Sequence, residues 1–200
     1  MDREQLFRYI LDMEWEMFTN VHNKDGKASC QNDHETFVIM RLAQLKTWDE
    51  EILASYFLDL LEAKEAGRNL MTEKYAYMME KTYPDEFMKL KDSLPVVSDA
   101  AKVFARAILK IYVVWEDEME RKYPKIRKRG RRSNTEAVSD GNVTMEDYHY
   151  CELITYSERT LQLLLEYIGQ NAKRNLYMEE VANMVQAYGY KDLDAAEAAL

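Results

Sequence analysis

"REQLFRYILDMEWEMFTNV", residues 3–21, carries the spacing that decides the fold class. Its apolar residues recur three and four positions apart, as they do along one face of an α-helix: Leu6, Phe7, Ile10, Leu11, Met13, Met17, Phe18 and Val21. One acidic residue, Glu14, falls inside this apolar stripe at a helical rotation of about 100° per residue. Because a buried carboxylate without a partner is very costly, Glu14 is expected to be paired or protonated.

The rest of the sequence keeps the helical pattern. Only three prolines and six glycines occur among 200 residues, beside twelve methionines, and this composition favours helix over strand. Residues suited to capping a helix precede the later apolar runs: Asp33 or Thr36, Thr47, Asn69, Ser98 or Asp99, Thr144, Ser157 and Asn175. We predict one all-α domain over residues 1–200, a bundle of about seven to nine helices. Residues 191–200 are expected to fray.

The second half of the chain resembles the first. The triplets at 68–70 and 174–176 are both Arg-Asn-Leu and lie 106 residues apart, and "TWDEEIL" at 47–53 matches "TYSERTL" at 155–161 at an offset of 108. Farther upstream, Trp15-Glu16 matches Trp115-Glu116 at an offset of 100. Either coincidence of helical periods or an internal duplication explains these matches. A duplication predicts half-repeats of about 3–95 and 98–195 packed about a pseudo-twofold axis.

The net charge of the chain makes nucleic acid an unfavourable partner. A net charge of -9 and a pI near 5.0 argue against general nucleic-acid binding, which needs a basic surface. One run, "KIRKRGRRSNTEAVSDGN", is basic and then small and polar. A basic run of this kind can bind nucleic acid or an anionic surface, but we expect a solvated, mobile loop over about 124–143. Residues Lys122–Arg132 are also a candidate surface for a protein partner.

The sequence also indicates the compartment. No run approaches the ~18 apolar residues of a membrane span, and the first residues lack the apolar core of a signal peptide. The two cysteines, Cys30 and Cys151, are too few for a disulfide framework. We therefore expect a cytoplasmic protein with reduced thiols and no membrane partner.

Polar residues recur on the inner face of the second predicted helix. Phe37, Arg41, Gln44 and Trp48 share one face, and the offset of 108 maps them onto Met145, His149, Glu152 and Tyr156. Each half thus places two polar groups between large apolar ones. We predict that the polar members of both sets meet Glu14 in the interior, near the pseudo-twofold axis.

Two interpretations of this cluster stay open. In the first, the protein is a small-molecule-binding protein or small enzyme with a buried polar pocket between the halves. Arg41, with Gln44 and Tyr156, would hold a small anionic or amino-acid-like ligand, and Glu14, Glu152 and His149 would supply acid–base catalysis. In the second, the cluster only fixes helix register, and the protein is an adaptor that binds a protein partner.

A polar connection, "NVHNKDGKASCQNDHETF", follows the first helix over residues 20–37. It is interpreted either as a lid over the pocket, in which Asn23, Gln31 and Asp33 contact the ligand, or as a surface loop whose side chains cap helices. Cys30 with His22 or His34 as base lacks a third member of a catalytic triad, so a buried, inert cysteine is expected instead.

Known site motifs are missing. Glu146 and His149 have the Glu-x-x-His spacing of half a di-iron site, but the equivalent positions in the first half are Val38 and Arg41, so no metal site is predicted. The sequence contains no Gly-rich phosphate loop, no paired Cys-x-x-Cys, no His-Glu-x-x-His and no Gly-x-Ser-x-Gly. The cofactor, if any, stays unknown.

Four motifs give the chain a family resemblance: "LDMEWEMFTNVHN", "GKASCQNDHETFVIMRLAQ", "EAKEAGRNLMTEKYAYMME" and "CELITYSERTL". With them the chain resembles, over nearly its whole length, a bacterial all-helical family called domain of unknown function 4125. The resemblance implies that these residues belong to the family pattern: Glu14, Trp15, Asn23, Gly26, Cys30, Gln31, Asp33, Phe37, Arg41, Gln44, Asn69, Lys74, Tyr75, Glu152 and Tyr156. That pattern has an Arg-Gly pair where this chain has Tyr150-Cys151, so no role carries over to this segment. The resemblance implies no activity.

Overall fold

The computed structural model describes residues 1–22, 26–130 and 143–200 of the chain. This described part contains eleven α-helices, two 3-10 turns and no strand, which confirms the all-α prediction. It has more helices than the seven to nine expected. Two short helices stand where a loop and a frayed end were predicted, α7 (Pro124–Arg127) and α12 (Leu193–Ala199), and residues 84–90 form a further short helix, α5 (Pro84–Leu90).

Eight longer helices make up the body of the molecule. The first half contains α1 (Arg3–Thr19), α2 (His34–Leu45), α3 (Glu50–Glu65) and α4 (Leu70–Thr82), with 3-10 turns at Ser29–Asn32 and Lys91–Ser93. The second half contains α6 (Asp99–Lys122), α9 (Met145–Leu153), α10 (Glu158–Gln170) and α11 (Leu176–Ala187).

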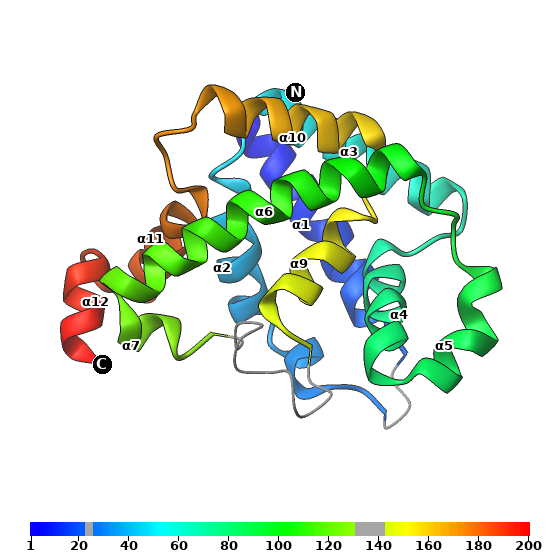
Figure 1. The fold of residues 1–200 in the computed structure, drawn as a ribbon, viewed down its shortest axis with the longest axis horizontal. Coiled ribbons are helices and arrows are strands. Elements are labelled where there is room, and N and C mark those ends of the chain that lie inside the picture. The colour runs from blue at the N-terminus through cyan, green and yellow to red at the C-terminus, as the bar shows by residue number, and fades with distance from the viewer. Residues whose placement is uncertain (23–25, 131–142) are drawn as a thin grey trace.

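The two halves pack in the same way. In the first half α1 contacts α2, α3 and α4, and in the second α6 contacts α9, α10 and α11. Between the halves α3 packs on α10, while α2 packs on α11 and α4 packs on α9 (Figure 1). The ends of α2 and α9 therefore approach each other inside the bundle. The internal duplication stays a prediction, which this pattern of contacts supports.

Side-chain caps set the beginnings of the longer helices. Asn69, Ser98 and Thr144 accept hydrogen bonds from backbone N–H groups in the first turns of α4, α6 and α9, as expected. The cap of α3 was expected at Thr47 but is Asp49, which accepts from Ile52 N at 2.9 Å. Thr47 instead donates to the Gln44 carbonyl at 2.8 Å, at the end of α2.

Two segments differ from the expected loops. Residues 124–127, predicted to begin a mobile basic loop, form α7, and Ile126 and Arg127 are buried. The guanidinium of Arg127 lies 3.3 Å from a Glu116 carboxylate oxygen, which explains how a cation enters the interior. The rest of the predicted loop lies largely at 131–142, outside the described residues. At the C-terminus α12 does not fray, because Asp192 caps it and Leu193 and Ala196 are buried.

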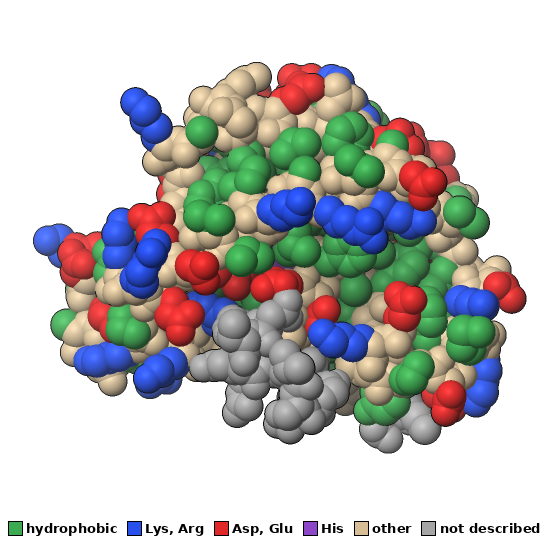
Figure 2. Space-filling view, in the orientation of Figure 1, with side chains coloured by type: hydrophobic (Ala, Val, Ile, Leu, Met, Phe, Trp, Pro, Cys, Tyr) green, Lys and Arg blue, Asp and Glu red, His purple; other side chains and the backbone are tan. Residues whose placement is uncertain are grey.

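The surface carries both signs of charge. In Figure 2 Lys and Arg side chains gather in a row over α6, and acidic and basic side chains alternate around α7 and α12. Basic residues are therefore not confined to the basic run that follows α6. Among the described residues, none of the helices has the length and apolar character needed to cross a membrane.

Candidate functional site

A buried ion-pair cluster centres on Arg41 of α2. Its Nε and Nη2 atoms donate to the two carboxylate oxygens of Glu14 at 2.8 and 2.5 Å, so the pair is bidentate. Its Nη1 atom donates to the Gln44 side-chain oxygen at 2.5 Å and to Glu152 at 2.9 Å. The cluster thus joins α1, α2 and α9, and most of the Arg41 donors already have acceptors.

Glu14 is fully enclosed, as its place in the apolar stripe of α1 indicates. The residue has 0 % of its surface exposed. Besides the bidentate pair with Arg41, it accepts a hydrogen bond of 2.6 Å from the Tyr56 hydroxyl on α3. Burial and the neighbouring Glu14 charge raise the pKa of Tyr56 well above its usual value, so this hydroxyl stays a donor.

Glu152 of α9 is the second buried carboxylate. Lys74 of α4 donates to one of its oxygens, and the Tyr156 hydroxyl donates to the other at 2.7 Å. Burial alone would raise the pKa of Glu152, but Lys74 and Arg41 outweigh burial and hold that pKa well below its usual value. Glu152 is therefore a fixed anion, which opposes the predicted role as a general acid.

Charge in the cluster is balanced, since Arg41 and Lys74 face Glu14 and Glu152. Lys74 also lies over the Tyr148 ring, 3.5 Å from the ring centroid. Lys74 and Tyr56 were not among the residues that the sequence predicted to meet here. The sequence does contain the pattern that would have predicted them. Both residues fall inside the apolar stripes of their helices, as Glu14 does in α1, and both are buried.

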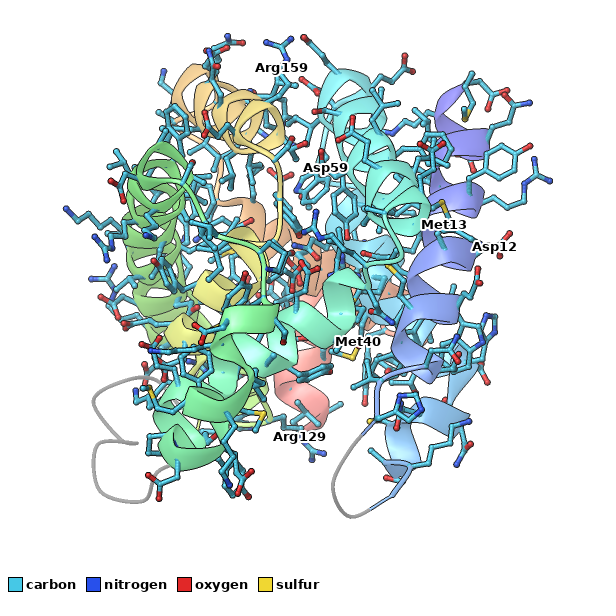
Figure 3. The ribbon with its side chains drawn as sticks, turned by 90° about the vertical axis from the view of Figure 1, so that its right-hand side faces the viewer. Asp12, Met13, Met40, Asp59, Arg129 and Arg159 are labelled. Atoms are coloured by element: carbon cyan, nitrogen blue, oxygen red, sulfur yellow. The ribbon has the colours of Figure 1, made fainter. Side chains whose placement is uncertain are left out.

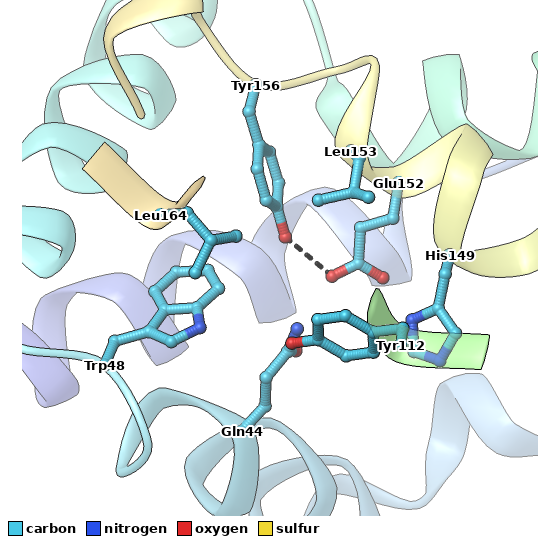
Figure 4. A pocket seen from close by; sticks show the side chains of 8 residues that line it. All are labelled: Gln44, Trp48, Tyr112, His149, Glu152, Leu153, Tyr156 and Leu164. Carbon is cyan, nitrogen blue, oxygen red and sulfur yellow. Dashed lines mark hydrogen bonds between the residues drawn. The ribbon is translucent and has the colours of Figure 1, made fainter. Parts of the chain in front are cut away.

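A small cavity lies next to the cluster, at the meeting point of the two halves (Figure 4). Its volume is about 10 Å³, which is room for about one water molecule. It is lined by Gln44, Trp48, Tyr112, His149, Glu152, Leu153, Tyr156 and Leu164. The cavity thus combines side chains from both predicted sets of inner-face residues.

Trp48 brings an unusual donor to this cavity. The residue is 1 % exposed, and its indole N–H has no hydrogen-bond partner among the described residues. In Figure 4 the indole nitrogen lies on the side of the ring that faces the other lining residues. Buried N–H groups nearly always have an acceptor, so this one indicates a place for an oxygen atom from outside the described chain.

A second group of titratable side chains adjoins the cavity through His149. The Nε2 atom of His149 lies 3.7 Å from Glu116 on α6, and its ring packs on Tyr112 at 5.2 Å. Burial raises the pKa of Glu116 to about 7, although Arg127 acts to lower it. Burial likewise raises the pKa of the half-buried Glu180 on α11 to about 8, against the opposing effect of Arg41. These carboxyl groups, which the sequence did not indicate, exchange protons near neutral pH.

The comparisons give a family. The family model described as "Protein of unknown function (DUF4125)" matches residues 4–198. The chain belongs to this family. No curated protein and no solved structure matches the chain.

Within this DUF4125 protein, several residues of the family pattern meet in the cluster: Glu14, Arg41, Gln44, Lys74, Glu152 and Tyr156. The contacts join residues from α1, α2, α4 and the α9–α10 region. These six residues, which the resemblance assigns to the family pattern, therefore form one connected set of side chains. In the described part of the DUF4125 chain, no group of three or more His, Cys, Asp or Glu side chains is placed to hold a metal ion.

Other members of the pattern shape the connection after α1. Gln31 donates to the Phe18 and Val21 carbonyls at 2.8 and 3.0 Å, which ties the 3-10 turn to the end of α1. Asp33 is exposed and caps α2 by accepting from Thr36 N at 3.0 Å. Neither Gln31 nor Asp33 lines the cavity, and Asn23 lies outside the described residues. Their assignment to a ligand stays a prediction.

One of the two thiols differs from the expectation. Cys30, predicted to be buried, is exposed, because Gln31 takes the inward position of the 3-10 turn. Cys151 is buried, and burial raises its pKa to about 12. The Cys151 thiol is therefore protonated at neutral pH and is a poor nucleophile.

Proposed function

We propose that this DUF4125 protein binds a small polar molecule in the cavity between its two halves. The observation that carries the proposal is the buried Trp48 N–H, which faces the cavity and lacks an acceptor in the described chain. A buried donor without a partner costs about 1–3 kcal/mol. A ligand oxygen that accepts from Trp48 would recover this free energy.

The ligand is expected to be uncharged. Arg41 and Lys74 already face two carboxylates, so the cluster beside the cavity has no excess positive charge to offer an anion. A buried charge without a partner is very costly. The amide of Gln44 and the hydroxyl of Tyr112 line the same cavity and suit a carbonyl or hydroxyl compound. The anionic ligand favoured by the sequence would have to displace a carboxylate from Arg41.

An acid–base step, if the protein has one, belongs to His149 in this proposal. Of Glu14, Glu152 and His149, Glu14 does not line the cavity and Glu152 is held as an anion. His149 lines the cavity and faces Glu116, whose pKa of about 7 suits proton exchange at neutral pH. Binding is the primary proposal, and this step depends on it.

The competing function is that of an adaptor that binds a protein partner. In this function the ion-pair cluster around Arg41 has a purely structural role. The complete pairing of both buried carboxylates favours it, because a network of this kind fixes the arrangement of α1, α2 and α9 without any ligand. The orphan Trp48 N–H favours binding, because a structural network has no need of it.

Thermal unfolding with small probes separates the two functions. Acetamide and N-methylacetamide are expected to raise the Tm of the wild type, and acetate at the same concentration is not. Trp48→Phe keeps an apolar ring but removes the N–H, so the acetamide affinity should fall about five- to tenfold. The matched control is Trp15→Phe, since Trp15 does not line the cavity. Absence of any shift in the wild type, or an equal shift in Trp48→Phe, contradicts the proposal.

A further inference from the structure

A surface groove shares the lining residue Tyr156 with the cavity. Its volume is about 250 Å³, and its walls come from α3, α4, the start of α6 and residues 154–158, which connect α9 to α10. Asp59 of α3 is one of its lining residues, and Figure 3 shows it on the side of α3 that faces α10. The groove opens to solvent and, unlike the cavity, is large enough to receive a small molecule.

Tyr156 lines both the groove and the cavity. Its ring packs on Tyr56 at 4.8 Å and on Trp48 at 6.0 Å, and its hydroxyl donates to Glu152 at 2.7 Å. Tyr156 is the one residue that the linings of the two spaces share in the described part of the chain. Its hydroxyl holds the ring in place through one hydrogen bond to the ion-pair cluster.

We infer that the groove is the entrance to the cavity and that the Tyr156 ring is the gate between them. The inference rests on the proposed function, because it supplies the room that a ligand larger than water requires. Rotation of Tyr156 away from Glu152 would join the cavity of about 10 Å³ to the groove of about 250 Å³. Gating by a side chain at the mouth of a site is a common way to admit a ligand while excluding bulk water.

The groove also selects by charge. Its lining includes the carboxyl groups of Asp59, Glu62, Glu73 and Glu158 and one guanidinium, Arg68. Arg68 is already paired with Glu73 at 2.7 Å. The remaining acidic groups repel anions, so the entrance admits neutral or positively charged small molecules. This agrees with the uncharged ligand argued from the cluster.

Quenching of Trp48 fluorescence by acrylamide tests the gate without any ligand. In a Trp15→Phe/Trp115→Phe background, Trp48 is the single tryptophan. Tyr156→Ala is expected to raise the acrylamide quenching constant several-fold, and Tyr156→Phe, which keeps the ring but loses the bond to Glu152, is expected to raise it by a smaller factor. The matched control is Tyr56→Ala, because Tyr56 is an equally buried ring against Trp48 that lines neither space.

Equal quenching in Tyr156→Ala and Tyr56→Ala, or no increase in Tyr156→Ala, overturns the inference. If circular dichroism shows that either alanine variant is unfolded, Tyr156→Leu and Tyr56→Leu replace them in the same comparison. In the open variant the caesium quenching constant of Trp48 should exceed that of iodide when each is divided by its value for free N-acetyltryptophanamide, and the reverse order overturns the charge selection. Failure of the binding proposal is distinct, since it appears as the absence of an acetamide shift in a protein whose Trp48 is still gated by Tyr156.

Discussion

Arg41 lies between two buried carboxylates, Glu14 and Glu152, and each of these has further donors of its own. Burying such groups costs desolvation free energy, and their mutual attraction does little more than offset that cost. The network therefore adds little to the total stability while it stays complete. Removal of one member is strongly destabilising, because the remaining charge is then buried without compensation.

Arg41→Met tests this dependence. The substitution keeps an unbranched apolar chain but leaves Glu14, which is 0 % exposed, with the Tyr56 hydroxyl in place of a cation. The free energy of unfolding in urea should fall by about 3–5 kcal/mol. The double variant Glu14→Gln/Arg41→Met removes both charges and should recover more than half of the loss. A loss below about 1 kcal/mol, or additive effects in the double-mutant cycle, contradicts the buried pair.

Helical periodicity was enough to predict which side chains enter this cluster from α1 and α2. Glu14 and Arg41 occupy positions where a regular helix presents apolar residues, so their inward direction follows from local spacing. Glu152 follows from the offset of 108, which maps Gln44 onto it. Lys74 and Tyr56 follow from local spacing, since they lie between apolar residues of α4 and α3. The approach of Glu180 does not follow, because it depends on α11 of one half packing against α2 of the other.

The short helix α7 is an element whose formation local residue spacing cannot predict. Its sequence is part of a strongly basic run, which indicates a solvated loop. In the structure, the Glu197 carboxylate of α12 accepts from the backbone N–H groups of Lys125 and Ile126 at 2.9 Å each, and Glu116 of α6 pairs with Arg127. The helix is thus held by long-range contacts, which the four residues of α7 do not encode.

The buried carboxyl group of Glu116, on α6, makes stability depend on pH. Burial raises the folded-state pKa of Glu116 from 4.5 to about 7. Its contribution to stability is therefore fully present below about pH 4.5 and is lost as the pH rises through 7. Between about pH 5 and 8 this group alone should lower the free energy of unfolding by up to about 3 kcal/mol. Glu180, with a pKa of about 8, acts in the same direction.

Glu116→Gln should flatten this slope in urea unfolding measured from pH 5 to 8. The readout is the slope, because loss of the carboxylate also leaves Arg127 with one partner fewer and lowers stability at every pH. Glu120→Gln, an exposed site on the same helix, is the matched control and should keep the wild-type slope. An unchanged slope in Glu116→Gln would show that Glu116 does not titrate in this range.

At the scale of the whole molecule, equivalent contacts in the two halves support the predicted duplication. Arg68 pairs with Glu73 through bonds of 2.8 and 2.7 Å, and Arg174 pairs with Glu179 through bonds of 2.8 and 2.6 Å. These pairs obey the offset of 106 found in the sequence. Each arginine precedes a capping asparagine that also bonds to the first helix of its own half. A common ancestral unit explains all of these matches together.

The structure aligns α1 with α6, the first helix of each half, at a different offset from the one that the sequence match gave. Asn69 donates to the Met17 carbonyl at 2.8 Å, and Asn175 donates to the Trp115 carbonyl at 3.1 Å. These bonds set α1 and α6 at an offset of 98, in place of the 100 given by the two Trp-Glu pairs. At an offset of 98, Glu14 in the first half is equivalent to Tyr112 in the second half. The buried carboxylate of one half therefore corresponds to a cavity-lining hydroxyl in the other.

Helices of each half pack on helices of the other half, and this arrangement predicts that neither half folds alone. Because α2 packs on α11, α4 on α9 and α3 on α10, separation would expose the core residues Trp48, Tyr56, Leu161 and Leu164. Fragments 1–97 and 98–200 are therefore expected to melt without a cooperative transition by circular dichroism. Mixed together, they should form a 1:1 complex by size exclusion and regain cooperative melting.

The cut follows Val97, one residue after Val96, which is 96 % exposed, and it leaves the cap Ser98 on α6. The control is the intact chain with a protease site inserted at the same place, since cleavage after folding should leave the complex together. A fragment that melts cooperatively by itself would show that its half is an independent domain, and the cavity between the halves would then be an interface between two folded units. Fragments that fail to reassociate, while the cleaved control stays intact, would show that the halves meet only when chain connectivity holds them together during folding.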